Sequence, residues 1–195
     1  PAPLTVTLSD SSVSKVYDGL ATYTGYTPSY AVTGLVDGDT AASLTQTGRS
    51  FNAATVSGAT SFTVSGMSIS GVTGSKGSVG SDYTLNTTSL TVPGSITPRP
   101  VAVDVTAGVK KVYDSTTNFN NLNITLGAVK DENNATVAGT GLVGSDVVKV
   151  LASGGGFDDK NVGTGKSYTL TGLTLTGADA GNYQLASGDS ISGIN

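Results

Sequence analysis

Acidic side chains are the residues of this chain best suited to chemistry. Asp158 and Asp159 are adjacent, and glycoside hydrolysis uses two carboxyl groups at a set separation. Neighbouring residues of a strand point to opposite faces, so this pair is poorly placed to act on one bond. The single glutamate, Glu132, lies in an expected loop, and the chain has no histidine and no cysteine. These features predict that the protein is not an enzyme.

The same kinds of residue could supply oxygen ligands to calcium. The candidates are Asp37, Asp39, Asp131, Glu132, Asp158 and Asp159. Calcium takes six to eight converging oxygens, and no loop here has a known ligand spacing. Weak calcium binding is therefore the one cofactor hypothesis, and no other metal or cofactor is expected. The alternative interpretation is a set of solvated turn acids that keep the protein soluble.

A Tyr-Asp pair occurs twice, as Tyr17-Asp18 and as Tyr113-Asp114, each time within the sequence KVYD. Aspartate accepts backbone hydrogen bonds in turns, and Gly19 tolerates a positive φ. We interpret the pairs as turn chemistry, with each tyrosine ring packed at a sheet edge, rather than as catalytic groups.

These motifs belong to a larger repetition. Residues 51–71 align without a gap to residues 157–177, and Phe51 pairs with Phe157. Shorter matches flank this stretch: KVYD at 15–18 and 111–114, GLVDGD at 34–39 with GLVGSD at 141–146, and DYTL at 82–85 with NYQL at 182–185. The sequence therefore predicts two copies of one module, over 1–97 and 98–195.

The predicted boundary is ITPRP at 96–100. Pro98 and Pro100 fix φ and favour extended neighbours, which predicts a short, stiff linker. The chain opens with PAPLTV, which aligns with PRPVAV of the second copy, and near its end Ile194 falls close to the place of Ile96. We expect the chain to be a pair taken from a longer tandem array.

Composition excludes several functional classes. Charged residues make up 12% of the chain, the net charge is −4 and there is no basic cluster, which excludes nucleic-acid binding. No segment reaches the ~20 apolar residues that a membrane-spanning helix needs, so no membrane insertion is expected of this fragment. A cysteine-free chain rich in Thr, Ser and Gly suits a secreted bacterial surface protein, here expected to be a monomer.

Short alternating segments separated by glycine turns predict the fold. Leu4, Val6 and Leu8 alternate with threonines, a period typical of half-buried strands. No helical period extends beyond about two turns. We predict an all-β protein: two tandem antiparallel β-sandwich (Ig-like) modules in an elongated arrangement. The rival is a β-grasp-like module with one short helix against a sheet.

One segment refines that prediction. Residues 173–185 read LTLTGADAGNYQL, the pattern around a tyrosine corner, in which a phenol bonds to nearby backbone. Tyr183 would be the corner residue, with Asp179 and Gly181 shaping the turn. Tyr83 has the matching place in the first module, with a longer and altered turn.

These residues resemble a known family. KVYDG at 15–19, the segment 157–185 and the ITP linker are similar to the YDG-type repeats of large bacterial surface exoproteins, and the linker is similar to that of related MBG-type repeats. Such repeats occur in filamentous-haemagglutinin-like adhesins. The chain departs from the pattern at Ser115, where the motif has glycine, and at 52–54, where Asn-Ala-Ala replaces Asp-Asp-Lys.

The resemblance implies a structural stalk or spacer that projects a distal binding domain of an extracellular, cell-surface or secreted adhesin. Its partners would be neighbouring repeat modules. The alternative is a module that binds carbohydrate or a host protein through its loops. Core and hinge positions would then matter most: Phe51, Phe157, Tyr83, Tyr183, Pro98 and Pro100.

Overall fold

A computed structural model describes residues 1–36, 38–103, 109–119, 122–124, 141–186, 188 and 190–194. The chain folds as two compact units, Pro1–Thr97 and Pro98–Asn195, here called unit 1 and unit 2. The division falls inside the proline-containing segment 96–100. Three of the calcium candidates, Asp37, Asp131 and Glu132, lie outside the described residues.

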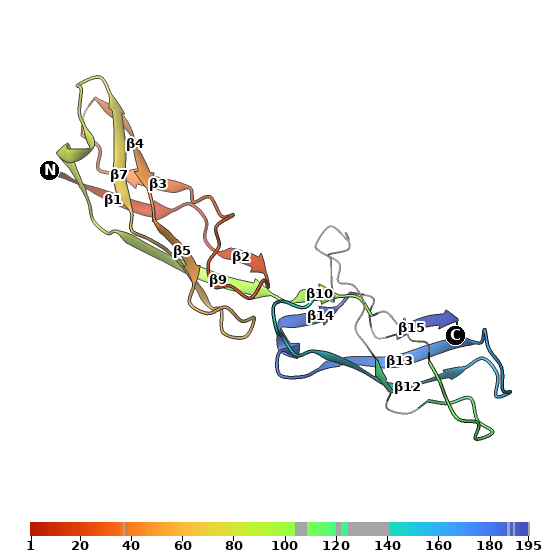
Figure 1. Ribbon diagram of the computed structural model, residues 1–195. Coiled ribbons are helices and arrows are strands. Elements are labelled where there is room, and N and C mark those ends of the chain that lie inside the picture. Colours follow the sequence, from red (N-terminus) through yellow and green to blue (C-terminus); the bar gives the residue numbers. More distant parts are fainter. Residues whose placement is uncertain are drawn as a thin grey trace. The chain divides into compact units, whose positions relative to one another are not determined.

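Unit 1 is built from strands and one 3-10 turn (Figure 1). In chain order these are β1 (Ala2–Leu8), β2 (Val13–Val16), β3 (Tyr30–Thr33), β4 (Asp39–Thr45), β5 (Gly48–Phe51), β6 (Ser61–Ser65), β7 (Ser68–Gly74), η1 (Gly80–Asp82), β8 (Tyr83–Leu85) and β9 (Ser89–Thr97). They form three sheets, in the orders β3-β1-β8, β4-β7 and β2-β9-β6-β5.

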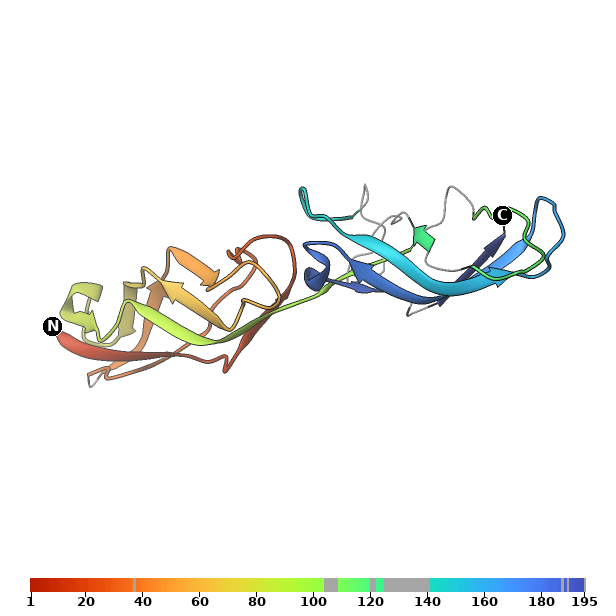
Figure 2. The same cartoon turned by 90° about the horizontal axis from the view of Figure 1, so that it is seen from below.

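Unit 2 has a similar arrangement of strands, but some of its strands are longer because each spans positions that hold two successive strands in unit 1. Its elements are β10 (Arg99–Val101), β11 (Leu122–Ile124), β12 (Lys149–Phe157), β13 (Ser167–Thr176), η2 (Ala180–Asn182), β14 (Tyr183–Leu185) and β15 (Ser190–Ile194). The sheets have the orders β10-β14 and β11-β12-β13-β15. The antiparallel pair β12–β13 is the long ribbon that is visible in both views (Figures 1 and 2).

The prediction of an all-β, sandwich-like protein is confirmed. The rival β-grasp module needed a helix, and the described parts of the chain contain only the 3-10 turns η1 and η2. Among the described strands, the pairs β1–β8, β2–β9 and β10–β14 are parallel. The sequence did not predict these parallel pairs, because the alternation within a strand says nothing about its partner's direction. No helix within the described ranges is long and apolar enough to cross a membrane.

The alternating apolar residues form the core of each unit. In unit 1, Leu4, Phe62 and Val64 are fully buried, while Thr5 next to Leu4 is exposed and Thr63 between Phe62 and Val64 is half-buried. In unit 2, Val150 and Leu170 are equally buried. Burying such side chains stabilises a fold by roughly 1.5–3 kcal/mol each, which explains why the apolar skeleton is common to both units.

Strand registers show how the units correspond. Ser61 lies opposite Pro93 in unit 1, and its counterpart Ser167 lies opposite Ile194 in unit 2. Ile194 therefore takes the place of Pro93, three residues before Ile96, near which the sequence match placed it. Matching residue types along the sequence could not detect this shift, because turns absorb insertions while the register fixes the strands.

Pro100 is a strand residue rather than part of a linker. It lies in β10 opposite Gln184, as Pro3 lies in β1 opposite Thr84. A proline lacks the N–H that a strand paired on both sides would need. Both prolines lie where a single partner is paired, because β3 joins β1 only from Thr5 onward and, among the described strands, β10 pairs with β14 alone. Only Pro98 lies between β9 and β10, so the predicted linker is shorter than the sequence suggested.

Candidate functional site

The YDG motif of unit 1 closes around a buried lysine. Lys15 lies in β2 and is only 7% exposed. Its ammonium forms an ion pair with Asp18 at 2.6 Å and donates to the carbonyl oxygens of Leu20 at 2.6 Å and Thr22 at 2.9 Å. The Asp18 carboxylate also accepts the N–H of Leu20 at 2.9 Å. We call this arrangement the lysine cage. It holds the loop that follows β2.

Aromatic rings cover the cage. The Lys15 ammonium lies 5.9 Å from the ring centre of Tyr23 and 5.8 Å from that of Phe51, within the range of cation–π attraction. The loop is also bonded to the sheet, since Tyr23 N–H donates to Arg49 O and Phe51 N–H donates to Ala21 O, both at 2.9 Å. A buried charge is stable only where such partners replace water, and here they do.

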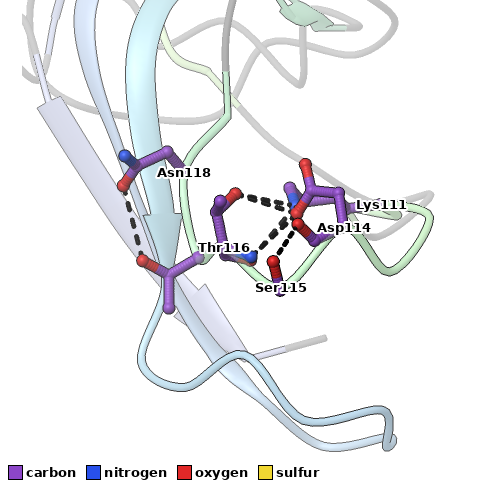
Figure 3. Close-up of polar contacts among 6 residues, drawn as sticks. Lys111, Asp114, Ser115, Thr116 and Asn118 are labelled. Carbon is purple, nitrogen blue, oxygen red and sulfur yellow. Dashed lines mark hydrogen bonds and ion pairs between the residues drawn. The ribbon is translucent and has the colours of Figure 1, made fainter.

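Unit 2 builds the same cage in a more exposed form (Figure 3). The ammonium of Lys111 pairs with Asp114 and donates to the carbonyl oxygen of Thr116 at 3.1 Å. Asp114 also accepts the Thr116 N–H at 2.9 Å. The ion pair with Lys111, aided by the Thr116 N–H, lowers the pKa of Asp114 from 3.8 to about 2. Phe119 and Phe157 stack edge to face beside the loop, their ring centres 4.8 Å apart.

The Tyr-Asp pairs are turn chemistry, as the sequence predicts for the aspartates. Gly19 has φ +79°, and Ser115 holds φ +64° at the same place in unit 2. That region is strained for a residue with a side chain, so the departure from the glycine motif has a conformational cost. Tyr17 is 5% exposed and belongs to the core, while Tyr113 is 58% exposed. Tyr17 follows the edge strand β2 and is packed there, whereas Tyr113 is exposed.

Each unit also contains a second shared contact, here called the phenol clamp. In unit 1 the hydroxyl of Tyr83 donates to Asp39 Oδ2 at 2.5 Å and accepts the N–H of Val36 at 3.1 Å. In unit 2 the hydroxyl of Tyr183 donates to Asp146 Oδ2 at 2.7 Å and accepts the N–H of Val143 at 2.8 Å. Burial, followed by the bond to Asp39, raises the pKa of Tyr83 above its ordinary value.

The tyrosine-corner prediction gave the wrong hydrogen-bond partner for the tyrosine hydroxyl. The phenol reaches a segment about forty residues upstream, which is the repeated motif at 34–39 and 141–146. Both units have a three-residue 3-10 turn just before the tyrosine. The turn that leads to it is longer in unit 1, as predicted, because residues 75–79 separate β7 from η1 whereas residues 177–179 separate β13 from η2. The sequence did contain the signal, since the GLV-D motif recurs, but its contact with the tyrosine depends on tertiary folding.

The two other residues of the predicted corner behave differently from each other. Asp179 is the residue before η2, and its carboxylate accepts the N–H of Val147 at 2.8 Å, so it shapes the turn and ties it to a second segment. A side chain at Gly181 would meet nothing within 4 Å, and Ser81 stands there in unit 1. Gly181 is therefore not required by the turn.

The remaining acids are occupied within turns. Asp159 pairs with Lys166 and accepts the N–H of Asn161 at 2.6 Å, and the pair with Lys166 lowers its pKa. Asp158 accepts the N–H of Asp159 at 3.0 Å. Within the described ranges, no three acidic side chains gather as a metal site would require. The described calcium candidates thus lie apart: Asp39 in the phenol clamp, the other two in an exposed turn of unit 2.

Unit 2 has a hollow of about 320 Å³ beside its lysine cage. Its charged and aromatic lining includes Lys110, Lys111, Tyr113, Asp159, Lys160 and Lys166. Three of the four lysines have no counterpart in unit 1, where the equivalent positions hold Ser14, Ala54 and Thr60. Unit 1 therefore lacks three of the ammonium groups that line this hollow.

Together these features define a class of protein: a tandem pair of all-β repeat units, each closed by a lysine cage and a phenol clamp. The family model for the YDG domain matches residues 1–92 and again 97–191. The chain therefore belongs to the YDG domain family. No curated protein and no solved structure matched the chain.

Proposed function

We propose that this chain is a structural stalk or spacer of a bacterial cell-surface or secreted adhesin. Its units would hold a distal binding domain away from the envelope, with neighbouring repeat units as their partners. The proposal rests on which residues the two units have in common. Both have the contacts that make them fold, and they differ in the polar residues that could do chemistry.

The two units differ most clearly in the residues that follow Phe51 and Phe157. These two rings occupy matching places, and each packs against the loop of its own lysine cage. The residues that follow are Asn-Ala-Ala at 52–54 in unit 1 and Asp-Asp-Lys at 158–160 in unit 2. A function that needed those side chains would be lost from one unit, whereas a mechanical function needs only the skeleton.

Unit 1 also shows how a spacer would carry force. Tension on the chain enters through the first and last strands, β1 and β9. Each of them is paired along its length by two partners in succession. β8 pairs with Ala2–Leu4 of β1 and β3 with Thr5–Leu8, while β6 pairs with Ser89–Pro93 of β9 and β2 with Gly94–Thr97. Pulling along such a strand loads the bonds of a ladder together rather than one after another. The phenol clamp adds a tie between segments far apart in the sequence.

Small-angle scattering of the two-unit chain tests the spacer proposal. A single globule of this length would have a radius of gyration of about 16 Å. We expect a clearly larger radius and a pair distribution with a long tail, because a spacer keeps its units apart. A radius near that of one globule, unchanged by ionic strength, would contradict the proposal.

A second candidate is recognition of host glycan or protein through loops at one end of a unit. The observation that favours it is the lysine-lined hollow of unit 2, which suits an acidic ligand. A glycan array would test it. The substitutions Lys110→Ser and Lys160→Ala give unit 2 the residues that unit 1 carries, and saturable binding that both abolish would favour this candidate.

A further inference from the structure

Arg49 of unit 1 is a half-buried cation without an acidic partner. It lies in β5, and its Nη1 donates to the carbonyl oxygen of Tyr26 at 2.5 Å. No acidic side chain of the described residues forms an ion pair with it. Its other guanidinium nitrogens make no bond to the described residues and are not buried, so they are open to solvent.

Two half-buried tyrosines lie beside this guanidinium. Burial raises the pKa of Tyr30, and the nearby charge of Arg49 opposes that rise. The Tyr30 hydroxyl donates to Gln46 Oε1 at 3.2 Å, and the Tyr26 hydroxyl donates to the exposed Asp10 carboxylate at 2.6 Å. The Tyr30 ring has no aromatic partner among the described residues, so it is free to stack. We call Arg49, Tyr26, Tyr30 and Gln46 the arginine patch.

Unit 2 shows that the fold does not need the arginine. Gly155 stands there in place of Arg49 and has the matching place in the strand register. The backbone bond that ties the preceding loop to this strand is present in both units, from the N–H of Tyr23 at 2.9 Å and from the N–H of Phe119 at 2.8 Å. A half-buried charge without a partner costs free energy. Its presence in one unit alone therefore points to binding rather than to folding.

We propose that the arginine patch binds a sugar that carries a carboxylate, such as a uronic or sialic acid unit of a glycan. The planar guanidinium of Arg49 would hold the carboxylate through two parallel hydrogen bonds. The ring of Tyr30 would cover the apolar C–H face of the sugar. The Gln46 amide, which both donates and accepts, would bond to the sugar hydroxyls.

An acidic sugar suits the patch better than an acidic peptide does. Peptides are held mainly by apolar side chains that fill complementary surfaces. The large apolar side chains that unit 1 exposes among its described residues are Leu20, Val36 and Val79, and none of them belongs to the patch. The patch is also separate from the lysine-lined hollow, which lies in unit 2. The inference therefore depends neither on that hollow nor on the spacer proposal.

NMR titration of the isotopically labelled two-unit chain tests the proposal. The probes are a trimer of galacturonic acid and sialyllactose, and their neutral controls are a trimer of galactose and lactose. We expect an acidic sugar to shift the amide signals of Arg49 and Tyr30 saturably. Its neutral control should bind at least about tenfold more weakly, a difference of about 1.4 kcal/mol. Which of the two probes binds identifies the kind of acidic sugar.

Matched variants separate binding from folding. Arg49→Gly gives unit 1 the residue of unit 2 and should abolish saturable binding. Arg49→Lys keeps the charge but loses the planar fork, so it should fold normally and weaken binding by about tenfold. Lys76→Ala removes an exposed cation of unit 1 outside the patch and should leave binding unchanged. Thermal unfolding of each variant checks that unit 1 is still folded.

Four results would overturn the proposal. The first is no saturable shift in unit 1 with either acidic sugar at millimolar concentration, and the second is equal affinity for the neutral controls. The third is binding that the folded Arg49→Lys and Arg49→Gly variants retain in full. The fourth is a different ligand or place: a tripeptide of glutamate that binds the patch more tightly than the sugars, or shifts confined to unit 2.

Discussion

Replacing Tyr183 by phenylalanine removes a single hydroxyl that joins two distant segments of unit 2. The hydroxyl donates to the Asp146 carboxylate at 2.7 Å and accepts the N–H of Val143 at 2.8 Å. Tyr183 is 5% exposed, so water cannot fully replace the lost partner. We expect Tyr183→Phe to destabilise unit 2 strongly and to leave unit 1 unchanged.

The magnitude follows from the two bonds. A neutral hydrogen bond contributes about 1 kcal/mol, and one to a charged group about 1.5–3 kcal/mol. Their sum predicts a loss of about 2.5–4 kcal/mol in the free energy of unfolding. For a unit of this size the unfolding temperature should then fall by roughly 10–30 °C. Tyr83→Phe should do the same to unit 1, where the bonds are 2.5 and 3.1 Å.

Differential scanning calorimetry of the two-unit chain is the assay, because each variant should move one of two transitions. Tyr168→Phe is the matched control, since it gives buried Tyr168 the residue that unit 1 already has at Phe62. Its effect should be small. If Tyr183→Phe lowered stability by no more than this control, the phenol clamp would not be a structural tie and our reasoning would be refuted.

Three further predictions concern the lysine cages. Ser115→Gly should stabilise unit 2 by about 1 kcal/mol by relieving a positive φ, and Gly19→Ser should destabilise unit 1 by a similar amount. Lys15→Met should lower the stability of unit 1 by roughly 3 kcal/mol, because it leaves buried acceptors unpaired, and Lys111→Met should cost unit 2 less. The lowered pKa of Asp114 should make unit 2 lose stability as the pH falls from about 4 towards 2.

Denaturant unfolding checks the first two of these predictions, and thermal unfolding at a series of pH values checks the third. The sign of the pH effect is set by the folded state, which holds the Asp114 carboxylate ionised more strongly than the unfolded chain does. In Asp114→Asn, the stability of unit 2 should depend less on pH between about 4 and 2. If the stability of Asp114→Asn fell at low pH as steeply as that of the parent chain, the argument from the pKa of Asp114 would be contradicted. If Ser115→Gly did not raise the stability of unit 2, the argument from its positive φ would be contradicted. Equal losses of stability for Lys15→Met and Lys111→Met would contradict the argument from burial.

The sequence predicted the parts of the fold that are local. Alternation at Leu4 and Val6 marks a strand because the period of side chains in a strand is two, and both residues are buried as expected. The repeated stretch at 51–71 and 157–177 lies in matching places of the two units. These features can be predicted without knowing which segments of the chain pack against each other.

The contacts that close each unit could not be predicted in the same way. The partner of Tyr183 lies about forty residues upstream, and no local pattern encodes that distance. The i,i+3 spacing of Lys15 and Asp18 hints at an ion pair, but the carbonyl oxygens of Leu20 and Thr22 reach the ammonium only after the loop has folded back. Parallel pairing of β1 with β8 likewise depends on the whole unit.

Single-molecule force spectroscopy of the two-unit chain, held at its ends, tests the central claim most directly. If each unit is an independent bead that bears load, stretching should give two separate unfolding events. Each event should lengthen the chain by about 30 nm, the extended length of one unit (Pro1–Thr97) less its folded length. A single event of twice that length, or extension without force peaks, would contradict the account of a duplicated mechanical spacer.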